Sequence, residues 1–113
     1  MYNKDKTTIV SYLKSNLNVV VPEGVVTIGG NAFYAKYITS VKLPSTLKVI
    51  GEAAFIMNNL NEIQIPSSVE SIGSSCFSQN GQLERIIVNK PKDSITGAPW
   101  GATKGDRVVI WQG

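Results

Sequence analysis

Ser74, Ser75 and Cys76 are adjacent side chains of the types that act as nucleophiles in enzymes. A serine or cysteine nucleophile needs a neighbouring base to take its proton, and that base is most often histidine. The sequence contains no histidine, which also removes the imidazole ligands of most zinc sites and the usual general base near neutral pH. We therefore expect no nucleophilic catalysis, no metal site and no cofactor.

Two further groups of residues carry only part of a chemical motif. Gly29-Gly30-Asn31 and the glycines within 97–105 lack the fixed order of glycine, lysine and serine or threonine that a phosphate-binding loop requires. We interpret both stretches as turns. Glu62 and Glu84 suggest a carboxylate pair, but Glu62 is aligned with Arg85 in the repeat that organises the chain. An outward-facing ion pair across neighbouring strands is therefore the simpler interpretation.

The repeat is 22 residues long, and seven columns, one of them the pair Ile-Gly, recur in register over three copies. They are Pro22, Pro44 and Pro66; Ile28-Gly29, Ile50-Gly51 and Ile72-Gly73; Phe33, Phe55 and Phe77; Ala32, Ala54 and Cys76; Val25, Leu47 and Val69; Val19, Val41 and Ile63; and Val21, Leu43 and Ile65. A single copy cannot bury its apolar positions, whereas stacked copies place each position on its equivalent. A period of this length with apolar columns predicts a solenoid of leucine-rich repeats.

Each copy is expected to contain a short strand, an extended piece and a helical turn. In Ile63-Gln64-Ile65, alternation directs the two isoleucines inward and the glutamine outward. Pro66 cannot donate to a strand ladder and ends the strand. Apolar residues of 69–72 return to the core, Gly73 permits a turn, and 74–78 forms a helical turn whose aromatic ring plugs the far side.

One residue is inserted near Gly81, and the repeat then continues at a step of 23. Ile86 and Val88 continue the strand columns, and Trp100 falls in the phenylalanine column. A further step of 22 aligns Val108 with Ile86 and Ile110 with Val88. The segment 107–111 is therefore predicted to be a fifth strand.

The outward positions of these strands form the candidate binding surface. Two neighbouring rows run along it, namely Val20, Lys42, Gln64, Ile87 and Val109, and Asn18, Ser40, Glu62, Arg85 and Arg107. The candidate contact residues are Lys42, Glu62, Gln64, Arg85, Ile87, Arg107 and Val109. Arginine is enriched at interfaces, and apolar residues that do not face the core require an explanation. The alternative is a solvated face that binds nothing. Aromatic residues clustered with basic ones are missing from this face, so nucleic acid is not an expected partner.

The whole chain, 1–113, is expected to be a single leucine-rich repeat domain, mostly β with short helical turns. Residues 1–16 are predicted to be an N-terminal β-hairpin cap whose second strand covers the first repeat. The repeats are 17–38, 39–60 and 61–83, and 84–113 is a degenerate repeat with a C-terminal strand cap. Trp100, larger than phenylalanine, is predicted to close that end of the stack.

The pattern Leu60-x-x-Ile63-x-Ile65-Pro66-x-x-Val69-x-x-Ile72-Gly73-x-x-Cys76-Phe77 resembles the BspA-like leucine-rich repeat family. Residues 3–8 resemble the hairpin that often precedes such arrays, and Ala98-Pro99-Trp100-Gly101-Ala102 resembles a motif that often closes them. The resemblance implies a bacterial or protozoal surface or secreted protein that binds host proteins or glycans, with some members in phage tails. It implies no ligand residues, because the shared positions are core positions.

We therefore predict a non-catalytic binding or adhesion module of an extracellular or cell-surface protein, recognising a protein or a glycan. The alternative is a structural spacer or terminal segment of a larger surface or phage-tail protein. Only Met1 and Tyr2 precede the hairpin turn, which favours a segment of something longer. The net charge of +3 is mild, no apolar run is long enough to span a membrane, and the single cysteine excludes an intramolecular disulfide. End-to-end self-association of the stack is left open.

Overall fold

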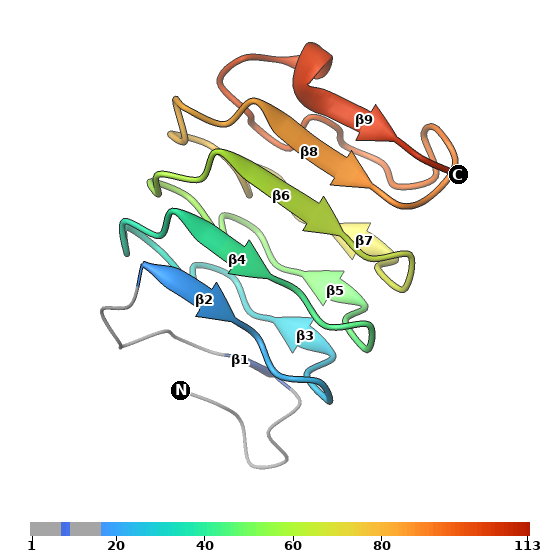
Figure 1. Ribbon diagram of the computed structural model, residues 1–113, viewed down its shortest axis with the longest axis horizontal. Helices are drawn as coiled ribbons and strands as arrows, with labels where there is room; N and C mark the ends of the chain where they lie inside the picture. Colours follow the sequence, from blue (N-terminus) through green and yellow to red (C-terminus); the bar gives the residue numbers. More distant parts are fainter. Residues whose placement is uncertain (1–7, 10–16) are drawn as a thin grey trace.

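A computed structural model describes residues 8–9 and 17–113. Its elements in chain order are β1 (Thr8–Ile9), β2 (Asn18–Val20), β3 (Thr27–Ile28), β4 (Ser40–Lys42), β5 (Val49–Ile50), β6 (Glu62–Ile65), β7 (Ser71–Ile72), β8 (Arg85–Val88), the 3₁₀ helix η1 (Asp106–Val108) and β9 (Val109–Trp111). The described chain winds into a solenoid of short parallel strands, which confirms the predicted fold class (Figure 1).

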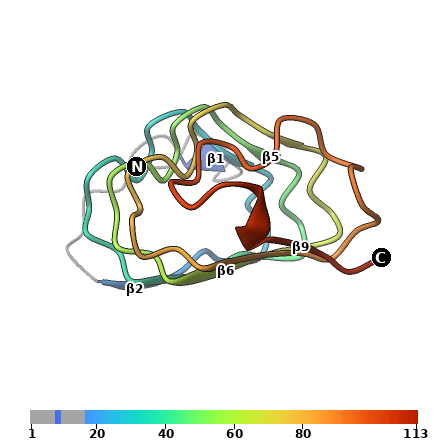
Figure 2. The ribbon, with the colours of Figure 1, turned by 90° about the horizontal axis from the view of Figure 1, so that it is seen from above.

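The strands form two layers with the core between them (Figure 2). One layer holds β2, β4, β6, β8 and β9, and its outward surface is called the strand face below. The other layer is a four-stranded parallel sheet in the order β1-β3-β5-β7. The observed pairs Val19↔Val41, Ile63↔Ile86 and Ile28↔Ile50 are the equivalents that the repeat predicts.

The inward columns form one continuous core. The repeated valine, leucine and isoleucine positions are all less than a tenth exposed. Phe33, Phe55 and Phe77 are fully buried and stack nearly parallel, with centroid separations of 5.0 and 6.0 Å and interplanar angles of 7° and 9°. Trp100 continues this column, as predicted, and is 1% exposed.

The repeated glycines are required by the close approach of neighbouring coils. A Cβ on Gly73 would collide with the backbone of Glu52, and a Cβ on Gly51 would collide with the backbone of Gly30. Neither glycine has the positive φ of a left-handed turn. Gly73 was expected to permit a turn that a Cβ would hinder. A Cβ is excluded there, but the cause is the contact between neighbouring coils and not the turn itself.

The predicted helical turn at 74–78 is wrong, because the segment forms a series of tight turns. Ser75 and Gln79 have φ of 57° and 58°, and Ala53 and Met57, one repeat earlier, have φ of 56° and 60°. A residue in the left-handed region interrupts a right-handed helix. In the described part of the chain, the single helical element is the three-residue η1.

Two buried asparagines, 22 residues apart, join neighbouring coils. The Asn58 Oδ1 accepts hydrogen bonds from the N–H groups of Lys36 and Ile38, both at 3.0 Å. Its Nδ2 donates to the C=O of Phe33 at 2.7 Å and of Phe55 at 2.9 Å. Asn80 repeats the arrangement one coil later, donating to Phe55 and Phe77 and accepting from Leu60. Sequence reasoning missed this column, although the 22-residue spacing of the two asparagines was its signal.

The last strand exists, but the predicted pairing is one residue out of register. Val109 lies opposite Ile86, Ile110 opposite Ile87 and Trp111 opposite Val88. The physical reason is η1, in which the Val108 N–H bonds the Gly105 C=O at 3.3 Å and the Val108 side chain is buried before the strand begins. The tight turn shifts the strand by one position along the chain.

The predicted N-terminal hairpin, 1–16, lies outside the described residues except for β1. Thr8 pairs with Thr27 and Ile9 with Ile28, in parallel. β1 is therefore the first strand of the opposite layer and pairs with β3. The hairpin cap itself stays a prediction.

Candidate functional site

The strand face carries most of the predicted contact residues. Lys42 lies in β4, Glu62 and Gln64 in β6, and Arg85 and Ile87 in β8. The observed pairs Glu62↔Arg85 and Gln64↔Ile87 form the two predicted rows across these strands.

Two of the predicted positions are corrected by the structure. Arg107 lies in η1, outside the strand ladder, and is exposed beside a shallow hollow that it shares with Glu84 and Lys104. Val109 pairs with Ile86 and packs against the core, so it does not belong to the outward row. Ile110 takes the place beside Ile87 that was assigned to Val109. Both corrections follow from the one-residue shift at η1.

The expected ion pair on the strand face is formed. The Arg85 Nε donates to the Glu62 Oε1 at 2.6 Å, and both side chains are well exposed. This hydrogen bond, together with the charge of Glu62, raises the pKa of Arg85 above its ordinary value. Glu62 is therefore a partner of Arg85 and not of Glu84, whose Oε1 lies 3.3 Å from the Lys104 Nζ.

The strand layer is interrupted between β4 and β6. The Thr39 N–H donates to the Leu17 C=O at 2.8 Å and the Val21 N–H to the Lys42 C=O at 2.9 Å, on the β2 side of β4. The Glu84 N–H donates to the Asn61 C=O at 2.9 Å, on the β8 side of β6. Within the described residues, β4 and β6 share no ladder and fall into separate sheets, whereas the opposite layer is continuous. We call this interruption, between Ser40–Lys42 and Glu62–Ile65, the seam.

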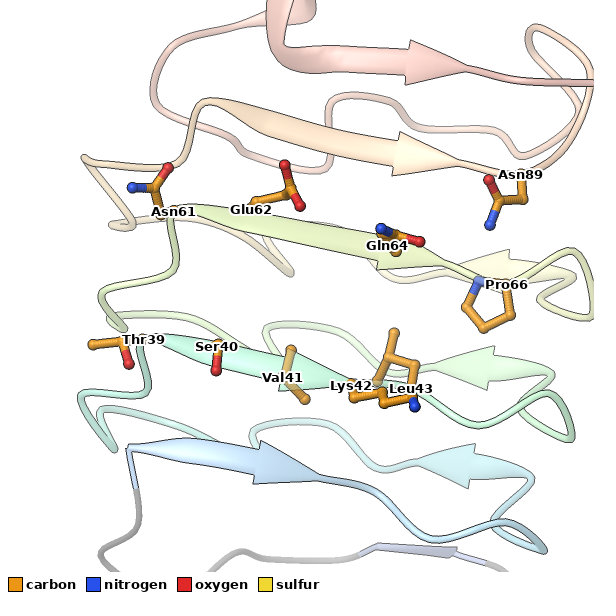
Figure 3. A pocket seen from close by; sticks show the side chains of 10 residues that line it. All are labelled: Thr39, Ser40, Val41, Lys42, Leu43, Asn61, Glu62, Gln64, Pro66 and Asn89. Atoms are coloured by element: carbon orange, nitrogen blue, oxygen red, sulfur yellow. The ribbon is translucent and has the colours of Figure 1, made fainter.

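An open hollow of about 510 Å³ lies over the seam (Figure 3). Its lining residues come from both strands and the turns beside them: Thr39, Ser40, Val41, Lys42, Leu43, Asn61, Glu62, Gln64, Pro66 and Asn89. Three of the predicted contact residues, Lys42, Glu62 and Gln64, are among them. The structure thus brings these three together, and sequence reasoning missed the hollow because main-chain pairing leaves no mark on side-chain types.

Comparison with known proteins identifies the family. The sequence model of one protein family, described as BspA type leucine rich repeat region (6 copies), matches residues 8–103. This chain belongs to the BspA-type leucine-rich repeat family. No curated protein matches it significantly.

One solved structure similar to this BspA-type chain is a leucine rich cell surface protein from Faecalibacterium prausnitzii A2-165. The two share 35% sequence identity with a TM-score of 0.61 over 63% of this chain. The match covers 19% of the other chain, so the matched part of this BspA-type chain spans about a fifth of that protein's length. In the described residues, no helix is both long and apolar enough to cross a membrane.

The candidate nucleophiles of this BspA-type chain lie either at the surface, as Ser74 and Ser75 do, or in the core, as Cys76 does. The sequence has no histidine to act as their base. Cys76 is fully buried in the column of Ala32 and Ala54, and burial raises the pKa of its thiol to about 12. At neutral pH it is a protonated core side chain. Across 8–9 and 17–113, no three His, Cys, Asp or Glu side chains gather in a way that would hold a metal ion.

Proposed function

We propose that this chain is a non-catalytic binding module of a bacterial surface or secreted protein, and that it recognises a protein or a glycan through its strand face. The observation that carries the proposal is the hollow on that face, which Lys42, Glu62 and Gln64 line on the two sides of an interrupted sheet. A solenoid holds such rows rigidly, so little conformational entropy is lost when a partner binds. The surface location is supported by the similar cell-surface protein.

A binding role suits the chemistry of the face better than catalysis does. The ionisable groups over the hollow are Lys42 and Glu62, and the Glu62 carboxylate is engaged by Arg85. General acid–base catalysis needs a group whose pKa lies near the working pH. The thiol of Cys76 is buried and protonated, so it supplies no nucleophile.

A spacer without a ligand is the second candidate. It is supported by the small share, 19%, of the similar cell-surface protein that the match covers. The two candidates differ in whether changes on the strand face alter binding.

The test uses two matched charge reversals. Arg85→Glu breaks an exposed ion pair with Glu62 on the strand face, and Lys48→Glu breaks an exposed ion pair with Glu70 on the turn before β5. Both variants and the unchanged chain would be applied to a glycan array and to immobilised extracellular-matrix and epithelial surface proteins. We expect Arg85→Glu, and not Lys48→Glu, to weaken the binding signal about tenfold or more, because like charges at an interface are repulsive. Equal binding by all three chains would exclude the strand face, and no binding at all would favour the spacer.

A further inference from the structure

We propose that the hollow over the seam is a binding site for a neutral saccharide. The proposal rests on the function proposed above, because it assigns the ligand class and the position of the site on the strand face. Its evidence is the unpaired main chain at the seam, the side chains around it and the apolar floor beneath it.

Among the described residues, two main-chain N–H groups at the seam have no protein partner. At the equivalent positions of the other coils, N–H groups such as those of Thr39 and Val21 donate to the neighbouring coil. At the seam the corresponding donors are the N–H groups of Asn61 and Leu43, and neither has a backbone acceptor within the described chain. Main-chain groups that are shielded from bulk water are nearly always paired, with protein, water or a ligand. Leu43 is only 8% exposed, and a ligand atom that accepts a hydrogen bond would pair its N–H.

The side chains around the hollow suit hydroxyl groups. Most of its polar lining is uncharged and able to hydrogen-bond: Thr39, Ser40, Asn61, Gln64 and Asn89. Amide and hydroxyl side chains present donors and acceptors at short spacing, and a sugar hydroxyl is itself a donor and an acceptor. Of the two charged lining residues, Glu62 is already paired with Arg85, so Lys42 is the one ionised lining group without a salt bridge among the described residues. The site therefore favours a neutral polyhydroxyl ligand over an ion.

The floor of the hollow is apolar. Val41 and Leu43 are 9% and 8% exposed, whereas the equivalent residues of β6, Ile63 and Ile65, are 1% and 0% exposed. Val41, Leu43 and Pro66 offer a small apolar surface in the hollow, which suits the C–H face of a sugar ring. The volume of about 510 Å³ lies within the range of small-ligand sites and suits one or two sugar rings.

An added peptide strand fits this site less well. Strand addition requires a free sheet edge with room for the incoming backbone about 4.8 Å away. At the seam the edges of β4 and β6 face each other and remain in contact, so no strand enters between them. A ligand must approach from outside, over the side chains, as a compact sugar does.

The test is a titration of the ¹⁵N-labelled full chain with neutral trisaccharides of glucose, galactose, mannose and N-acetylglucosamine at millimolar concentration. For at least one sugar we expect amide shifts concentrated in 39–43 and 61–66. Gln64→Ala is expected to weaken that binding about five- to tenfold, because one ligand hydrogen bond is lost. The control Gln82→Ala replaces another exposed glutamine, outside the hollow, and is expected to leave the affinity unchanged.

Three results would overturn the assignment. The first is the absence of shifts in these segments for every sugar. The second is a set of shifts that Gln64→Ala leaves unchanged. The third is that a tetrapeptide pool shifts the same amides when the sugars do not. Any of these results leaves the proposed function standing if Arg85→Glu still weakens binding to an immobilised protein, so failure of the saccharide site is distinguishable from failure of the binding module.

Discussion

The ring of Trp100 meets the ring of Phe77 edge-on, with centroids 6.3 Å apart and an interplanar angle of 74°. The phenylalanines of the preceding coils lie nearly parallel to one another, so the change of angle marks the end of the ring column. Trp100 is in turn covered by Trp111 at 6.0 Å and 61°, and its Nε1 donates to the Thr96 C=O at 2.8 Å. The indole thus packs between Phe77 and Trp111 and satisfies its own polar group.

Replacing this closing residue should be costly. Trp100→Ala is expected to lower the free energy of unfolding by about 3–5 kcal/mol, because a large side chain that is 1% exposed leaves a cavity. Trp100→Phe, which keeps the type of the column, should lose clearly less. Chemical denaturation of the three chains measures the difference, and a loss below about 1 kcal/mol for the alanine variant would contradict the closing role.

Gly73→Ala is expected to destabilise the solenoid by about 1–3 kcal/mol, the usual range for overpacking. The added Cβ would overlap the backbone of Glu52, and a backbone cannot move aside as a flexible side chain does. Gly81→Ala is the matched control, because a Cβ there meets nothing within 4 Å and φ is not positive. Thermal unfolding should separate the two variants. Equal midpoints would mean that the coils can separate at no cost.

Asn58→Ala should remove the link between neighbouring coils. It leaves the N–H groups of Lys36 and Ile38 without this partner, and each buried unpaired group costs about 1–3 kcal/mol. Asn59→Ala, an exposed neighbour, should change stability by less than about 0.5 kcal/mol. Hydrogen exchange of the Lys36 and Ile38 amides gives the local measurement. Unchanged protection of both amides in Asn58→Ala would show that other groups hold the coils together.

Cys76 predicts a loss of stability at alkaline pH. Burial raises the pKa of its thiol from 9.0 to about 12, so the unfolded chain releases this proton at a lower pH than the folded chain does. The unfolded state then binds fewer protons, and the free energy of unfolding falls as pH rises above about 9 towards 12. Cys76→Ala, which restores the residue type of Ala32 and Ala54, should flatten that part of the curve. Lysine and tyrosine titrations are common to both chains, so the difference between the two curves isolates the thiol. Identical curves would show that Cys76 is solvated.

The buried columns of the repeat could be predicted from the sequence. Phe33, Phe55 and Phe77 recur at a fixed step, and the structure stacks them as that step predicts. Prediction failed where no side chain signals the answer. Val108 is as apolar as Val109, and only the turn of η1 decides which of them enters the core before the strand begins.

The candidate site also has a part that the sequence predicts and a part that it does not. Alternation along the strands placed Lys42, Gln64 and Arg85 on an outward surface, because a side chain next to an inward isoleucine or valine must point away from the core. The seam was not predictable, because β4 and β6 have the same alternation as the strands that do pair. Arg107 and Val109 were assigned to rows that a single shifted residue removes from them.

The sequence by itself determined the solenoid, its period and its buried columns, because apolar side chains at a constant spacing can leave water only by stacking on their equivalents. The tertiary structure decided the register of β9 and the seam, where Lys42, Glu62 and Gln64 line one hollow. These features depend on the direction of main-chain and amide hydrogen bonds between coils. That direction is set by how the coils lie on one another, which residue types and spacing do not encode.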